Sequence, residues 1–153
     1  MTRASVILCL GTLTSCLLML TSCEDEDINV PAGALEEQPV DLSGQWQVSR
    51  AWQNGKDITD LLDFNEILLT LQMNGGPTAF QIKTGSAPFP VLEDGMWSFD
   101  DFAYPKSLNL RTNNSQRSID FTNPPISSSS DFALSFSLGC QDNLYTYEFR
   151  KVQ

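Results

Sequence analysis

The sequence predicts an all-β domain, an antiparallel up-and-down β-barrel of about eight strands. Hydrophobic and polar residues alternate with a period of two in eight short segments, which is the pattern of strands with one buried face. Glycine, proline and asparagine separate these segments, and no long stretch has the 3.6-residue period of a helix. A β-sandwich is the alternative, but its immunoglobulin-like form has no support from a Cys…Trp…Cys spacing.

The alternation is clearest toward the C-terminus. Residues 132–138 alternate phenylalanine or leucine with alanine and serine, and residues 144–152 place Tyr145, Tyr147 and Phe149 on one face. A short helix is predicted only near residues 58–64, where Thr59 would cap the first turn. The whole pattern predicts strands at residues 44–52, 66–73, 78–83, 95–99, 107–111, 117–122, 132–138 and 144–152.

Residues 1–22 have the features of a secretory signal peptide. Arg3 precedes an apolar run over residues 6–20, and small residues then lead to Cys23. The run is shorter than the roughly 20 residues that span a bilayer, and glycine, threonine and serine interrupt it. We therefore expect residues 1–22 to be removed, residues 23–40 to form an acidic, proline-containing linker, and residues 41–153 to form the barrel.

The end of this segment, Leu-Thr-Ser-Cys at residues 20–23, resembles the lipobox of bacterial lipoproteins. The resemblance implies cleavage before Cys23 and attachment of acyl chains, palmitate among them, to that cysteine. Residues 13–16 have the same form, but cleavage there would cut the apolar run short. The resemblance also implies more than one acyl chain, which anchors a protein stably. It further implies a location at the outer membrane, facing the periplasm or the cell surface. The acidic residues 24–27 resemble a surface-export signal and equally suit a solvated spacer.

The chain is strongly acidic, with a formal net charge of −10. Loss of residues 1–22 would remove one positive charge, that of Arg3, and leave −11. Nucleic-acid binding needs clusters of lysine and arginine, and so does an electrostatic hold on anionic lipid. The charge therefore argues against both, and membrane attachment is expected to come from the acyl chains.

The residue types argue against catalysis. The chain has no histidine, which excludes Ser-His-Asp and Cys-His catalysis and histidine-ligated zinc, and it has no phosphate-binding glycine motif. Cys140 has no second cysteine to pair with in the processed chain and suits a buried structural thiol. The acidic pairs at residues 93–94 and 100–101 fit solvated turns better than glycoside hydrolysis or calcium binding. We predict no enzyme activity, no cofactor and no metal.

The first predicted strand opens with Gly44-x-Trp46, which resembles the first signature of the lipocalin superfamily. The resemblance implies that Trp46 closes one end of the barrel and that Arg150, from the last strand, packs across its ring. Residues 42–46 and 54–59 are also similar to small lipocalin-like lipoproteins of Gram-negative bacteria, a mostly uncharacterised group. The later lipocalin motif around Thr-Asp-Tyr, the usual disulfide and the C-terminal helix are absent.

In an up-and-down barrel, alternate connections meet at one end, and in lipocalins this is the open end. One function that follows is binding of a small hydrophobic ligand inside the barrel. The residues expected to form the lid and the pocket are Leu61, Leu62, Phe64, Phe89, Trp97, Phe136 and Tyr147. The alternative is that these side chains plug a small barrel, which the short strands and many inward aromatic residues favour. The protein is then a solid interaction module that docks a partner envelope protein, for example through Phe102, Tyr104 and Pro105 at the opposite end.

Overall fold

The structure is a computed structural model that describes residues 31–33, 37, 39–139 and 142–152. The chain divides into two units, residues 1–36 and residues 37–153, and of the first unit only a turn at residues 31–33 is described. The expected signal peptide, the acylated Cys23 and Cys140 lie outside the described residues. In the second unit Val40 and Leu42 are buried, so the end of the expected linker already belongs to the barrel.

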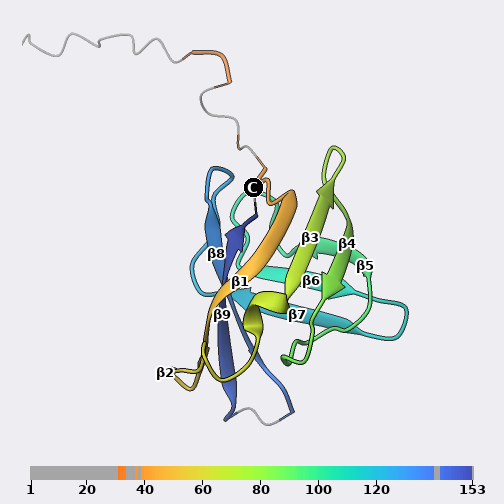
Figure 1. Cartoon of the computed structure of the whole chain (residues 1–153). Coiled ribbons are helices and arrows are strands. Elements are labelled where there is room, and N and C mark those ends of the chain that lie inside the picture. Colours follow the sequence, from red (N-terminus) through yellow and green to blue (C-terminus); the bar gives the residue numbers. More distant parts are fainter. Residues whose placement is uncertain (1–30, 34–36, 38, 140–141, 153) are drawn as a thin grey trace, which may run out of the picture. The chain divides into compact units, whose positions relative to one another are not determined.

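The second unit is a closed antiparallel barrel, which confirms the predicted fold class. Eight strands follow one another around it, and β9 returns to pair with β1 (Figure 1). The short β2 only extends β1 as a hairpin. The elements are β1 (Gly44–Gln53), β2 (Lys56–Asp57), η1 (Phe64–Glu66), β3 (Leu68–Met73), β4 (Pro77–Lys83), β5 (Gly95–Phe99), β6 (Ser107–Arg111), β7 (Gln116–Phe121), β8 (Asp131–Ser137) and β9 (Leu144–Lys151).

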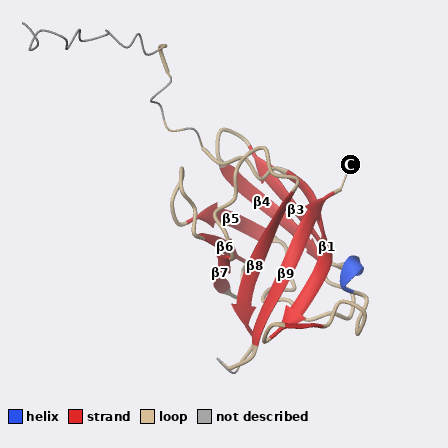
Figure 2. Ribbon diagram, turned by 90° about the vertical axis from the view of Figure 1, so that its left-hand side faces the viewer, coloured by secondary structure: helices blue, strands red, loops and turns tan. Residues whose placement is uncertain are grey.

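The ladder between β1 and β9 closes the barrel. It runs over seven residue pairs, from Trp46–Lys151 to Gln53–Tyr145, and shifts register at a bulge between Val48 and Arg50. Figure 2 shows β9 lying between β8 and β1. Because the first and last strands are paired, neither leaves a long free edge that would invite association with another chain.

Two other seams of the barrel are much shorter. The strands β4 and β5 pair at only two positions, and β7 pairs with β8 only at Asp120–Ser135 and Phe121–Leu134. Beyond Asp120–Ser135 the strands β7 and β8 diverge, and a groove of about 550 Å³ opens between them. Its walls come from Arg117, Ser118 and the segment from Ser135 to Gly139, so it is a surface groove in the side wall.

The region expected to be a helix near residues 58–64 is a loop. Thr59 does not cap a helix, because its hydroxyl accepts a hydrogen bond from the N–H of Ala51 at 3.0 Å and so fastens the loop to β1. Only the short 3-10 helix η1 is helical, and β3 therefore begins at Leu68 rather than at residue 66. The two residues of β2 are both exposed, so no alternation in the sequence could reveal that strand.

Gly44 begins β1 in a conformation that other residues rarely adopt, with φ = +127°. A Cβ atom there would lie 2.6 Å from Cε of Lys151, whose side chain crosses over Gly44. The Lys151 Nζ atom then stands 5.3 Å from the centre of the Trp46 ring. The Gly44-x-Trp46 pattern thus has a physical reason, because only glycine allows both the backbone turn and the passage of the lysine.

Gly44→Ala is expected to lower the free energy of unfolding by about 2–3 kcal/mol, because it adds backbone strain and displaces Lys151 from Trp46. Gly75→Ala is the matched control, since Gly75 also has a positive φ of +68° but nothing within 4 Å of an added Cβ. It should cost only about 1 kcal/mol. Chemical unfolding of the three proteins measures the difference. Equal losses for both variants would contradict a role for the lysine contact.

Candidate functional site

The order of the strands divides the connections between two ends of the barrel. The connections after β3, β5 and β7 lie at the end where the chain enters β1 and leaves β9, here called the entry end. The connections after β1, β4, β6 and β8 lie at the opposite end, here called the far end. The expected lid and pocket residues lie toward the far end, so the interior there decides between the pocket and the plug.

Phe89, from the connection between β4 and β5, fills the interior at the far end. It is 4% exposed, and its ring centre lies 5.6 Å from that of Phe136 and 6.5 Å from that of Tyr147. Phe136 and Tyr147 meet edge to face at 4.9 Å, and Phe64 meets Tyr147 at 5.3 Å. Four of the residues expected to line a pocket therefore pack against one another.

The hydroxyl of Tyr147 fastens this packing to the connection that carries Phe89. It donates a hydrogen bond to the carbonyl of Pro88 at 2.8 Å. Burial raises the pKa of the Tyr147 phenol well above its usual value, and the nearby Tyr145 raises it further. The phenol therefore stays protonated and remains a donor throughout the physiological range. Because Pro88 directly precedes Phe89 in the chain, this hydrogen bond also fixes the position of Phe89.

The aromatic packing continues from the far end to the entry end. Phe89 contacts Phe149 at 6.2 Å, Phe149 stacks on Phe132 at 5.2 Å, and Phe132 meets Trp46 at 4.7 Å. The indole N–H of Trp46 donates to the carbonyl of Leu42 at 2.8 Å, which satisfies its one polar atom. A continuous column of rings thus occupies the barrel from one end to the other.

The other predicted pocket residues lie elsewhere. Trp97 is buried, and its ring centre lies 5.1 Å from that of Phe99. Its indole N–H donates to the carbonyl of Gln72 at 2.9 Å. Leu61 and Leu62 were expected to form a lid over the interior. The structure leaves them outside, 70% and 45% exposed.

Leu61 and Leu62 belong to a loop that is held at both ends. We define it as residues 57–65 and, for the role proposed below, call it the docking loop. The buried Ile58 and Phe64 anchor it in the core. Within it, the N–H of Leu61 donates to the carbonyl of Ile58 at 2.9 Å and the N–H of Phe64 to that of Leu62 at 2.8 Å. These contacts fix the backbone while the two leucines face solvent.

A groove lined by Asp60 and Asp63 contains the two leucines. Asp57 accepts a hydrogen bond from the N–H of Thr59 at 2.9 Å, and hydrogen bonding to Thr59 lowers the pKa of Asp57. Asp60 and Asp63 stand on either side of the leucines in the sequence. The groove has a volume of about 470 Å³, and its lining includes Val48, Ser49 and Ser86 in addition to the loop.

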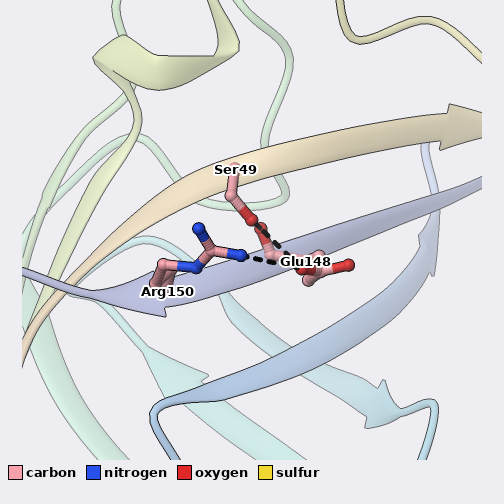
Figure 3. A network of polar contacts seen from close by, with 3 residues as sticks. All are labelled: Ser49, Glu148 and Arg150. Carbon is pink, nitrogen blue, oxygen red and sulfur yellow. Dashed lines mark hydrogen bonds and ion pairs between the residues drawn. The ribbon is translucent and has the colours of Figure 1, made fainter.

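Arg150 does not pack across Trp46, because it lies on the outer face of β9. Its guanidinium reaches Oε1 of Glu148 at 4.0 Å, and Ser49, at the bulge in β1, donates to the backbone carbonyl of Glu148 at 3.2 Å (Figure 3). Arg150 faces outward because Phe149 faces inward, and successive residues of a strand face opposite sides. The cation at the Trp46 ring is Lys151, two residues beyond Phe149.

The entry end exposes the aromatic residues that were expected to dock a partner. Phe102 is 54% and Tyr104 67% exposed, whereas Pro105 is buried. Two carboxylates brace their loop. Asp100 accepts hydrogen bonds from the N–H groups of residues 106 and 107, and Asp101 from those of residues 103 and 104, all at 2.8–2.9 Å. The hydrogen bond from the N–H of residue 107 is the main reason that the pKa of Asp100 is lowered.

A second loop, between β7 and β8, completes this surface. Ile126 is 60% exposed and lines an apolar hollow of about 270 Å³ together with Val40, Tyr104 and Pro125. Ser127 holds the loop to the entering chain, since its hydroxyl donates to the carbonyl of Pro39 at 3.2 Å. We call Phe102, Tyr104 and Ile126 the entry-end cluster. The sequence contained one signal for Ile126, an apolar residue in a segment otherwise made of proline and serine.

The described part of the chain offers no metal site and no membrane-spanning helix. In it, no three histidine, cysteine, aspartate or glutamate side chains gather closely enough to hold a metal ion. Among the same residues, no helix has the length and apolar character needed to cross a bilayer.

Residues 23–150 match the model of the family described as a domain of unknown function, DUF5004. The chain belongs to this family. The match begins at Cys23 and covers all the strands of the barrel except Lys151, the last residue of β9. Neither the curated proteins nor the solved structures gave a match to the chain.

In this DUF5004 barrel, Tyr147→Phe is expected to cost about 1 kcal/mol at neutral pH, because the carbonyl of Pro88 loses its donor. The native phenol has a raised pKa, so its contribution is fully present below about pH 10, where the unfolded phenol begins to ionise, and falls as the pH rises further. The variant should therefore lose less stability above pH 10 than the unmodified protein. Chemical unfolding between pH 7 and pH 11 measures this, with exposed Tyr104→Phe as the control. Equal alkaline losses in all three proteins would contradict the assignment.

Proposed function

We propose that this DUF5004 protein is a lipid-anchored cell-envelope protein whose barrel is a solid support for docking a partner envelope protein. It carries out no catalytic step in this role. The observation that carries the proposal is the packing of Phe89 against Phe136 and Tyr147, with Tyr147 bonded to Pro88. A side chain at this position occupies the space that a ligand would need, so the useful surface is on the outside.

The proposed anchor is an acylated Cys23. The lipobox-like residues 20–23 and the preceding apolar run support it, and so does the start of the family match at Cys23. The mature chain would then begin at the residue that carries the lipid. With a charge of −11 after processing, the protein needs acyl chains rather than charge to stay at a membrane.

The docking loop is the proposed contact for the partner. Ile58 and Phe64 already hold the backbone of the loop in one conformation. Binding of a partner to Leu61 and Leu62 would therefore cost little conformational entropy. Two exposed leucines in an ordered loop are the type of group that fills an apolar pocket in another protein. Asp60 and Asp63 line the same groove as the two leucines, so the partner is expected to have an apolar pocket with a basic rim.

A solid barrel gives a sharp expectation for small apolar molecules. The unmodified protein should show no saturable thermal shift with benzene or with a fluorescent fatty acid, because its interior is filled. Phe89→Ala should lose about 3–5 kcal/mol of stability and gain an apolar cavity. Such cavities take up benzene, so benzene should raise the melting temperature of the variant alone.

Phe89→Leu, which leaves a smaller cavity, keeps this test interpretable if the alanine variant does not fold. Saturable binding of the fatty acid by the unmodified protein, weakened by changes at Phe136, would contradict the solid barrel. It would favour a carrier of small hydrophobic ligands instead.

The docking loop is tested by photo-crosslinking in living cells. A benzophenone side chain at Asn65, which lines the groove beside the leucines, should attach to one envelope protein. The adduct should fall at least tenfold in Leu61→Ser/Leu62→Ser, because the apolar contact is lost. Leu92→Ser is the matched control, since Leu92 is 73% exposed on a different connection of the same end, and it should leave the adduct unchanged.

Neutralising Asp60 and Asp63 together, as asparagine, should also weaken the adduct several-fold if the partner's rim is basic. An adduct that survives the leucine changes, or the absence of any adduct, would contradict docking through this loop.

A further inference from the structure

We propose that the entry-end cluster inserts into the lipid surface to which the protein is anchored, so that the barrel stands upright on the membrane with its docking loop facing away. The proposal rests on the lipid anchor at Cys23. Phe102, Tyr104 and Ile126 would enter the headgroup region, and the occupant of the hollow beside Val40 would be lipid.

The cluster has the composition of a membrane-interface contact. Phe102, Tyr104 and Ile126 are each more than half exposed, although they are large and apolar or amphipathic. Phenylalanine and isoleucine suit the acyl boundary, and tyrosine is enriched at the interface because its ring is apolar while its hydroxyl stays in water. Two loops from different seams contribute these residues to one end of the barrel.

The loops are held in shape before any contact is made. Asp100 and Asp101 together accept four backbone hydrogen bonds from the turn that presents Phe102 and Tyr104. The N–H of Val40 reaches the carbonyl of Phe102 at 3.4 Å, and Ser127 ties the second loop to Pro39. Insertion would therefore cost little backbone entropy. More of the free energy gained by burying the apolar side chains would then favour membrane binding.

The length of the chain before the barrel favours lipid as the occupant. Pro39 follows Cys23 by sixteen positions, which limits their distance to about 55 Å and sets a mean distance of about 22 Å for a flexible chain. The cluster lies at the end where this segment enters. The far end is about 25 Å further away, given the ten residues of β1 and the usual tilt of barrel strands. An anchor at Cys23 would thus keep the entry end, on average, nearer to the membrane than the far end.

Charge determines which lipids suit this contact. Hydrogen bonds lower the pKa of Asp41 and of Asp100, so these two carboxylates of the entry end are ionised at neutral pH. An anionic surface would repel them, whereas a zwitterionic surface would not. The contact is therefore expected to be apolar, insensitive to salt on phosphatidylcholine, and weaker on phosphatidylglycerol.

The test uses the acylated mature protein, which begins at Cys23, in phosphatidylcholine vesicles that contain a photoreactive phosphatidylcholine. Mass spectrometry first checks acylation of Cys23, which tests the anchor by itself. Crosslinks to lipid should map to Phe102, Tyr104 and Ile126. They should fall at least tenfold in Phe102→Ser/Tyr104→Ser and stay unchanged in Leu61→Ser/Leu62→Ser at the far end. Replacing half of the lipid by phosphatidylglycerol should lower them in the unmodified protein.

These outcomes separate the two proposals. A non-acylated Cys23 would overturn the anchor. An acylated protein whose crosslinks map only to residues 23–38, or to the far end, would overturn the seating of the barrel and leave the anchor intact. A protein found covering the cluster in place of lipid would overturn it as well. Because the substituted side chains are exposed, melting temperatures within a few degrees of the original will show that the variants are folded.

Discussion

Pairing of the first strand with the last is the constraint on which the rest of this molecule depends. It converts a sequence of hairpins into a closed barrel, and closure forces every inward side chain into one small interior. The contacts of Gly44, Trp46 and Lys151 secure one end of that ladder. The bulge at Ser49, where Glu148 receives both a hydrogen bond and an ion pair, adjusts its register further along.

A barrel of eight strands has an interior just wide enough for side chains to fill. Here aromatic rings fill it in a continuous column from Trp46 through Phe132, Phe149 and Phe89 to Tyr147. Because the interior is filled, only residues on the surface remain available to bind another molecule. The two ends then differ in character, since the far end presents the two leucines of the docking loop and the entry end presents the aromatic pair and Ile126.

The difference between Arg150 and Lys151 shows how far sequence reasoning reaches. The alternation of β9 already places Phe149 inward, and the same alternation turns Arg150 outward and Lys151 inward. The expectation for Arg150 came from the lipocalin resemblance and not from the alternation, and the alternation was the better guide. Leu61 and Leu62 are a different case, because a loop has no period. Which of its apolar residues enter the core depended on the hydrogen bonds of Thr59 and on the packing of Phe64 against Tyr147.

The sequence by itself determined the all-β class, the approximate position of eight strands and the buried face of most of them, because a strand in a barrel must alternate. The alternation of the first strand predicts Trp52 on the face of Trp46 and Val48, but the bulge between Val48 and Arg50 reverses the order and buries Ala51 instead. It also excluded histidine-based chemistry through composition alone. The tertiary structure decided what fills the interior, which loop residues stay outside and which side chains meet at the two ends. Those outcomes arise from contacts between residues far apart in the chain, such as Tyr147 with Pro88 and Asp41 with Ser127, and no local pattern encodes them.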